Sequence, residues 1–143
     1  LSSSQKFAAE LLNGKSDLLE ARVAFMVNPG FDYVKVQWAT WQAGGIAVPL
    51  YLESPVPQLE YVLDDTQASI VVASPEHIEK LAPLCTTRKI TLIDATEKDN
   101  QHKKVSLPEL TPQRRAMILY TSGTTNLPKG VVSTHEILKA QIT

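Results

Sequence analysis

Residues 120–131 have the sequence YTSGTTNLPKGV, a stretch that is poor in core-forming residues and rich in small hydroxyl side chains. The apolar run 116–120 before it and the β-branched residues that resume at Val131 are typical of strands. Between these two runs, Gly123 and Gly130 allow backbone N–H groups to converge on an anion. The polar side chains of the stretch suit phosphate oxygens, and they are Thr121, Ser122, Thr124, Thr125 and Lys129. We therefore predict a phosphate-binding loop anchored on a sheet.

The stretch does not follow the Walker pattern, because Pro128 stands where that pattern needs a second glycine and Gly130 where it needs a metal-binding hydroxyl. A kinase-type Gly-x-Gly-x-x-Gly loop does not occur in the sequence either. The alternative of a Ser/Thr/Gly-rich hairpin turn without a ligand is disfavoured by the ordered pattern over a dozen positions.

The stretch resembles the signature loop of the adenylate-forming superfamily, Tyr-Thr-Ser-Gly-Thr-Thr-Gly-x-Pro-Lys-Gly-Val. That superfamily contains acyl-CoA synthetases, the adenylation domains of peptide synthetases, and luciferases. The one departure is Asn126, which replaces a glycine. Asparagine is the non-glycine residue that best tolerates a left-handed backbone, so we expect the turn to be preserved.

Composition limits the class of protein. The sequence has 143 residues, 43% hydrophobic and 20% charged, as in ordinary globular domains. Its net charge of −1 argues against a nucleic-acid or polybasic membrane partner. The single cysteine, Cys85, allows no intrachain disulfide, fits a reducing compartment and is expected to be structural.

No apolar run approaches the roughly 18 residues that cross a bilayer. No signal-peptide pattern follows Leu1, so we expect a processed or trimmed intracellular chain, cytoplasmic or in an organelle matrix such as the mitochondrial one, and not secreted.

Hydrophobic periodicity predicts alternating strands and helices. Strands are expected over residues 22–27, 46–50, 69–73, 89–94 and 115–120, and helices over 5–12, 31–43, 57–65, 75–81 and 136–142. Ser74 is expected to cap the fourth helix, and Ser133 with Glu136 to form a capping box for the last. The polar residues 95–113 are expected to form a surface loop. The pattern predicts an α/β fold with a mostly parallel sheet, helices on both faces, and ligands beyond the carboxyl ends of the strands.

Several residues outside the loop allow both a structural and a functional interpretation. Trp38 and Trp41 share a predicted helix face with Phe31 and Val34, and we expect them in the core rather than on an aromatic ligand platform. In the following helix, the inward residues are expected to be Leu59, Val62 and Leu63.

The remaining candidates are titratable residues. Asp64 and Asp65 have no partners at metal-ligand spacing and are expected at a solvated helix end. His77 and His102 lie in polar contexts and are expected to be exposed. His135 follows the loop by a few residues and either lines the acid or nucleotide site or belongs to a helix cap.

The resemblance extends beyond the loop, to residues 31–34, 37–38, 41–50, 59–63 and 131–135, which are similar to acyl-CoA synthetases and most of all to their malonyl-CoA synthetase-like branch. It implies that residues 1–143 are an N-terminal portion of the large N-terminal domain, without the rest of that domain or the C-terminal domain. It also implies nucleotide binding by Thr121, Ser122, Gly123, Thr124, Thr125, Asn126, Lys129 and Gly130.

The reaction implied by the resemblance has two halves. A carboxylic acid attacks Mg-ATP to give an acyl adenylate, and the thiol of CoA then displaces AMP. The resemblance places the Mg²⁺ ligands, the acid pocket and the catalytic lysine downstream, so we expect no catalytic residue here and no activity from this chain alone.

The residues leave two alternatives open: a stand-alone nucleotide- or phosphate-binding module, including a degenerate regulatory paralogue, and a structural α/β fragment with an idle loop. The sequence of this chain does not indicate which acid is activated, which thiol accepts the acyl group, or what the oligomeric state is.

Overall fold

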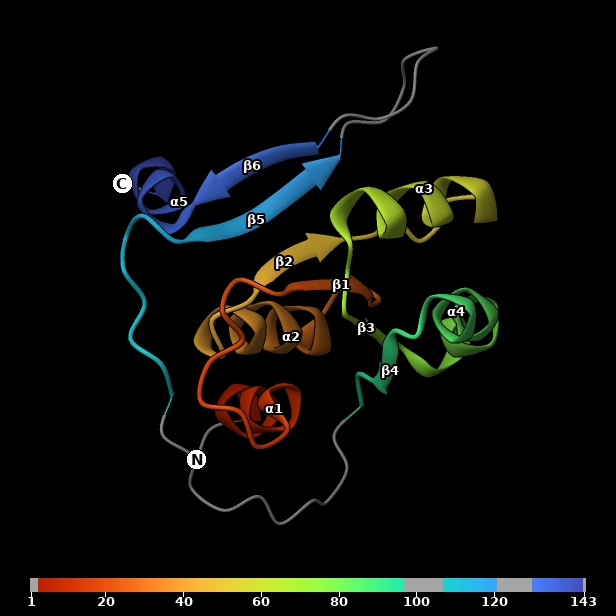
Figure 1. The fold of residues 1–143 in the computed structure, drawn as a ribbon, viewed down its shortest axis with the longest axis horizontal. Coiled ribbons are helices and arrows are strands. Elements are labelled where there is room, and N and C mark those ends of the chain that lie inside the picture. The colour runs from red at the N-terminus through yellow and green to blue at the C-terminus, as the bar shows by residue number, and fades with distance from the viewer. Residues whose placement is uncertain (1–2, 97–106, 121–129, 143) are drawn as a thin grey trace.

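A computed structural model describes residues 3–96, 107–120 and 130–142 of the chain. Helices and strands alternate along most of it (Figure 1). The helices are α1 (Ser3–Leu12), α2 (Phe31–Gln42), α3 (Val56–Thr66), α4 (Pro75–Arg88) and α5 (His135–Ile142). The strands are β1 (Arg22–Met26), β2 (Ile46–Pro49), β3 (Ile70–Ala73), β4 (Thr91–Asp94), β5 (Arg115–Tyr120) and β6 (Gly130–Thr134). Each predicted strand is confirmed to within a few residues at its ends.

The strands form one six-stranded sheet in the order β4-β3-β1-β2-β5-β6. Strands β1 to β5 are mutually parallel, whereas β6 runs antiparallel to β5. The predicted mostly parallel sheet is therefore confirmed. Residues 121–129 connect β5 with β6 and lie outside the described part of the chain.

Helices cover both faces of the sheet, as predicted. The chain passes from β1 through α2 to β2 on one side, and then returns through α3 to β3 on the other side of β1. Because crossovers between parallel strands are right-handed in nearly all proteins, connections that run in opposite directions are expected to place their helices on opposite faces. Figure 1 accordingly shows α1 and α2 on one side of the sheet, and α3 and α4 on the other.

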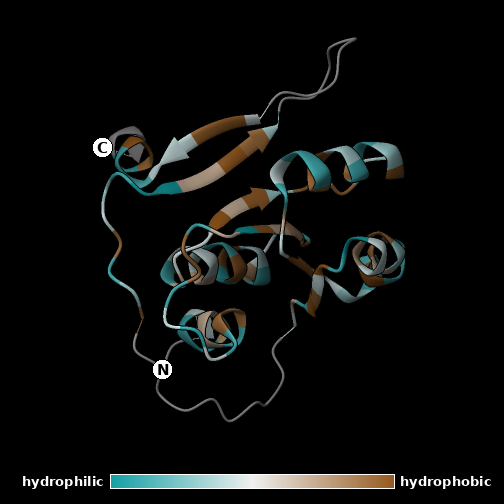
Figure 2. Ribbon diagram, viewed as in Figure 1, coloured by the Kyte–Doolittle hydropathy of each residue, from teal (hydrophilic) through white to brown (hydrophobic). Residues whose placement is uncertain are grey.

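Alternate residues of β1 supply two separate cores. Val23 and Phe25 pack with residues of α1 and α2, whereas Ala24 and Met26 pack with residues of α3 and α4. Figure 2 shows the apolar strands between helices whose outer faces are largely hydrophilic. The inward positions predicted for α3 are confirmed, since Leu59, Val62 and Leu63 are all buried.

The predicted inner face of α2 is wrong. Phe31, Val34 and Trp38 are exposed, with 52% of Trp38 accessible to solvent. Trp41 is partly buried against the core, and its Nε1–H donates to the Ala116 carbonyl oxygen at 2.7 Å. The buried face consists of smaller or longer side chains: Lys35, Val36, Ala39, Thr40 and Ala43. Small residues on that face let α2 approach α1 and the sheet closely, which bulky aromatics would prevent.

Lys35 is a buried cation that the pattern did not reveal. Only 3% of it is exposed, and its Nζ donates to the Ala95 carbonyl oxygen at 2.8 Å. Asp32 Oδ1 lies 3.4 Å from the same nitrogen, and the ring centroid of Phe7 lies 5.0 Å from it. These partners satisfy the charge and fasten α2 to the chain beyond β4.

The ends of two helices differ from the predictions. Helix α4 does not end near Leu81 but continues through Pro83 to Arg88, where the left-handed Lys89 closes it. Leu84 and Cys85 are buried in this added part, so core packing offsets the missing N–H of the proline. For α5, the cap is Thr134 rather than Ser133, because the Thr134 Oγ1 accepts from the Ile137 N–H at 3.2 Å.

Ser74 occupies the N-cap position of α4 as predicted, but its side chain makes no capping bond. Instead, its Oγ accepts from the Asn28 N–H at 3.1 Å. The hydroxyl thus joins the chain after β1 to the start of α4.

Candidate functional site

A pocket of about 240 Å³ opens at the carboxyl ends of β1, β2 and β5. Its lining comprises Val27, Pro29, Tyr33, Pro49, Leu50, Tyr51, Leu52, Leu119 and Tyr120. The connections that leave β1 and β2 here turn to opposite faces of the sheet, so a crevice opens between them. In open α/β sheets, ligands bind at such a topological switch point.

Tyr120 is the last described residue before the predicted phosphate-binding loop. Hydrogen bonds hold both its side-chain hydroxyl and its backbone carbonyl group. Only 5% of Tyr120 is exposed, and its hydroxyl donates to Asp65 Oδ2 at 2.6 Å. Its carbonyl oxygen accepts from the Tyr51 hydroxyl at 2.7 Å. Burial and the hydrogen bond to Asp65 raise the pKa of the Tyr120 phenol, which therefore stays protonated and remains a donor.

The acidic pair is exposed at the end of α3, as predicted, and each carboxylate also accepts a hydrogen bond. Asp65 accepts the Tyr120 hydrogen bond, whereas Asp64 accepts from Arg88 Nε at 2.7 Å and Nη2 at 3.1 Å. The guanidinium of Arg88 lowers the pKa of Asp64. Among the described residues, no cluster of His, Cys, Asp and Glu is arranged to hold a metal ion.

Gly130 is the one predicted phosphate-binding residue within the described part, and the structure gives it a packing role. It pairs with Tyr120 across the β5–β6 ladder. A Cβ at this position would lie 2.9 Å from Ile118 Cγ2 and 3.1 Å from Tyr120 Cζ, so only glycine leaves room for the ring. The other predicted contacts lie outside the described residues, and they are Thr121, Ser122, Gly123, Thr124, Thr125, Asn126 and Lys129.

Neither of the two histidines in the described part of the chain, His77 and His135, lines the pocket. His135 begins α5, and its ring packs edge-to-face on Trp41 with centroids 5.9 Å apart. Burial, with the nearby charge of Arg114, lowers the pKa of His135. It lies beside the amino end of β5, where its N–H donates to the Arg114 carbonyl oxygen, whereas the loop follows the carboxyl end.

His77 is partly buried rather than exposed, which corrects the prediction, since its Nε2 lies 2.9 Å from Asn28 Oδ1. The other predicted exposed histidine, His102, falls outside the described residues. Cys85 is buried, as expected for a structural thiol, and burial raises its pKa.

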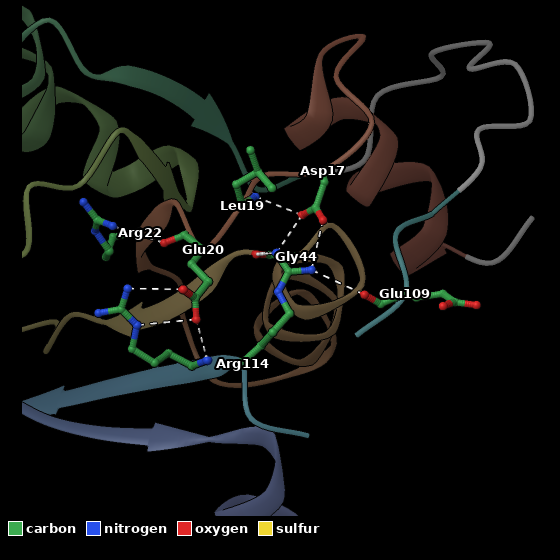
Figure 3. Close-up of polar contacts among 8 residues, drawn as sticks. Asp17, Leu19, Glu20, Arg22, Gly44, Glu109 and Arg114 are labelled. Atoms are coloured by element: carbon green, nitrogen blue, oxygen red, sulfur yellow. Dashed lines mark hydrogen bonds and ion pairs between the residues drawn. The ribbon is translucent and has the colours of Figure 1, made fainter. Parts of the chain in front are cut away.

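Two ion pairs fix the amino end of β5 (Figure 3). The Arg114 guanidinium donates to both carboxylate oxygens of Asp17, at 2.8 and 2.9 Å. The next residue, Arg115, donates from its backbone N–H and its guanidinium to Glu20. These arginines lower the pKa values of Asp17 and Glu20. Both ends of β5 are thus fastened, so Tyr120, which directly precedes the predicted loop, has a defined position.

The contacts at the carboxyl edge were missed from the sequence. Tyr51 and Asp65 come from segments that lie 69 and 55 positions from Tyr120 in the chain. The only signal of their role was indirect, since Tyr51 follows the carboxyl end of the predicted strand 46–50 and Asp65 ends the predicted helix 57–65.

None of the helices in the described part of the chain is long and apolar enough to cross a membrane.

Comparison with known proteins agrees with the geometry. A family model described as AMP-binding enzyme matches residues 2–143. Mitochondrial malonate–CoA ligase of Homo sapiens is 44% identical over 133 residues, which cover 89% of this chain and 23% of that protein. A fatty acyl-adenylate ligase from L. pneumophila, solved with acyl adenylate and pyrophosphate, superposes with a TM-score of 0.83 at 26% identity, covering 98% of this chain and 25% of that one.

ATP-bound MatB from Rhodopseudomonas palustris shares the fold at a TM-score of 0.82 and 23% identity, over 97% of this chain and 29% of that chain. This chain therefore spans about a quarter of the length of the relatives it matches. Because the family model covers almost every residue, the chain belongs to the AMP-binding enzyme family, as a relative of malonate–CoA ligases.

Proposed function

We propose that this chain is the N-terminal portion of an acid–thiol ligase that activates a carboxylic acid with ATP and transfers the acyl group to CoA. The observation that carries the proposal is the 44% identity with a malonate–CoA ligase over 89% of the chain. The same relative makes malonate the first acid to test and the mitochondrion the first compartment.

In the proposed reaction, a carboxylate oxygen of the acid attacks the α-phosphorus of ATP and pyrophosphate leaves with the electrons of the broken P–O bond. The CoA thiol then attacks the acyl carbon, and AMP leaves. Negative charge on the phosphates increases during the first step. The proposed role of the hydroxyls of Thr121, Ser122, Thr124 and Thr125 and of the Lys129 ammonium is to stabilise that charge, which is electrostatic rather than covalent catalysis.

The described residues have a supporting role in this proposal. They hold the strand that leads into the loop, through Tyr51 and Asp65 at one end and Asp17 at the other. Mg²⁺ would neutralise phosphate charge. The resemblance to acyl-CoA synthetases implies that its ligands lie downstream. Because the chain spans 23% of the human relative, we expect that it cannot complete adenylation alone.

The test is acid-dependent exchange of labelled pyrophosphate into ATP by the longest natural product of this gene. The acids should include malonate, short and long fatty acids, and aryl acids. Exchange that requires malonate supports the proposal and identifies the substrate class. Silence across the panel, in protein shown to be folded, refutes it and favours a nucleotide-binding module.

Variants of the loop sharpen the result. Lys129→Ala should reduce exchange strongly, because it removes the only cation of the stretch 120–131. Lys139→Ala, at an exposed lysine of α5, is the matched control and should leave exchange unchanged. Equal effects of the two substitutions would contradict a phosphate-binding role for Lys129.

A further inference from the structure

The carboxyl end of β5 lacks part of its backbone ladder with β2. The N–H groups of Ile46 and Leu50 donate to Ala21 and Phe25 on the β1 side. Since N–H groups alternate in direction along a strand, the odd-numbered positions of β2 face β5. One of these positions is Pro49, which has no N–H to donate.

Beyond Pro49, the hydroxyl of Tyr51 makes a hydrogen bond to β5 in place of a backbone N–H of β2. It donates to the carbonyl oxygen of Tyr120 at 2.7 Å, so a side chain supplies a hydrogen bond between the two segments. Tyr51 is half exposed, and its hydroxyl reaches the strand end from the rim of the pocket.

The ring of Tyr120 is fixed on another side. Its hydroxyl donates to Asp65 Oδ2 at 2.6 Å, and the absence of a Cβ at Gly130 leaves room for the ring. Three segments, namely α3, the chain after β2, and β6, therefore converge on one residue. That residue directly precedes the predicted phosphate-binding loop.

We propose that Tyr51 and Asp65 are positioning residues for the ATP phosphates, and that they act through Tyr120 without touching the nucleotide. This inference rests on the proposed function. The Tyr51 hydrogen bond fixes the carbonyl group of Tyr120, which is the last described backbone group before the predicted loop. Asp65 accepts from the Tyr120 hydroxyl, so Tyr120 is held both at its carbonyl group and at the end of its side chain.

The experiment compares Tyr51→Phe, Asp65→Ala and Asp65→Asn with the wild type, all in the longest natural product of the gene. Tyr61→Phe is the matched control, because it removes the same atom from a tyrosine of α3 outside this chain of hydrogen bonds. The measurements are the KM for ATP, the KM for the acid and kcat in pyrophosphate exchange, together with the equilibrium Kd for ATP and the melting temperature without ligand.

Tyr51→Phe and Asp65→Ala should each raise the KM and Kd for ATP roughly tenfold, the factor that corresponds to one net hydrogen bond. The KM for the acid should change little. Asp65→Asn should recover most of the loss, because its amide oxygen still accepts from the Tyr120 hydroxyl. Tyr61→Phe should leave ATP affinity unchanged.

Different outcomes separate the two proposals. If the wild type shows no exchange with any acid, the proposed function fails and this inference fails with it. If the wild type is active but Tyr51→Phe keeps its ATP affinity, only the positioning role is overturned. The same holds if Tyr51→Phe and Tyr61→Phe weaken ATP binding equally, or if Asp65→Asn fails to recover what Asp65→Ala loses.

Discussion

The ion pair between Asp17 and Arg114 gives a sharp prediction about stability. Asp17→Asn changes one oxygen to an amide nitrogen and keeps the size of the side chain. In the structure, the two Asp17 oxygens lie 2.8 and 2.9 Å from the two guanidinium nitrogens of Arg114, and Oδ1 also accepts from the Leu19 N–H at 2.9 Å. Asparagine retains one acceptor and places an N–H donor against the guanidinium, so one donor of Arg114 loses its partner.

The expected loss follows from burial. The Asp17 and Arg114 side chains are 22% and 16% exposed, so water can replace the missing bond only in part. A hydrogen bond to a charged group contributes about 1.5–3 kcal/mol net, which makes a loss of about 2 kcal/mol the expected result. At an m value of about 2 kcal/mol/M, the urea midpoint should fall by roughly 1 M.

The measurement is urea unfolding of the chain, followed by tryptophan fluorescence. The matched control is Asp64→Asn, which breaks a similar two-point contact with Arg88 but at an aspartate whose side chain is 62% exposed. Because water screens and replaces that contact, its loss should be clearly smaller. Equal losses from the two substitutions, or a loss below about 0.5 kcal/mol for Asp17→Asn, would refute the argument from burial.

Further predictions concern the same fold. The pKa values of Asp17 and Glu20 are lowered in the folded chain, so their stabilising contribution is complete above the unfolded values of about 4 and is lost as pH falls through the folded values. Urea midpoints should therefore decline below about pH 4, and less steeply in Asp17→Asn. Lys35→Met should cost about 1–3 kcal/mol in urea unfolding, because the buried Ala95 carbonyl oxygen loses its donor, and an unchanged midpoint would show that water replaces it. Leu59→Ala, at a fully buried position of α3, should cost about 2–5 kcal/mol through lost burial and a residual cavity, as measured in the same titration.

Strand positions and the parallel sheet could be predicted because their signals are local. The run 22–27 is largely apolar and ends at the turn residues 28–30. The apolar run 46–50 likewise begins directly after Gly44 and Gly45. Such runs, separated by helix-length segments, allow few topologies. Because the predicted loop directly follows the strand 115–120, its attachment to the carboxyl end of that strand was also predictable.

The inner face of α2 could not be predicted from its period alone. The large apolar residues Phe31, Val34 and Trp38 have helical spacing, but so do Val36 and Ala39 on the neighbouring face. Which face turns inward depends on how closely α1 and the sheet approach, and this is a property of the assembled fold. The same limit explains Lys35, whose partner Ala95 is 60 positions away in the sequence.

Part of the candidate site could be predicted from the sequence, and part could not. The phosphate-binding loop was recognised from a contiguous motif, and its residues between Tyr120 and Gly130 remain a prediction. Tyr51 and Asp65 belong to no contiguous motif, because they meet Tyr120 only after the sheet has formed. Residues that support a loop are scattered along the chain, whereas the loop itself is continuous.

Pro49 also matters while the chain is being made. Strands β1 to β4 and helices α1 to α4 all precede residue 95, so they can assemble on the ribosome before β5 has been synthesised. Until then β2 is the outer strand, and an uncovered strand edge invites pairing with other nascent chains. Proline at such an edge denies one hydrogen bond to any wrong partner. The residue that leaves the finished ladder incomplete thus removes one N–H donor from the edge that the unfinished protein exposes.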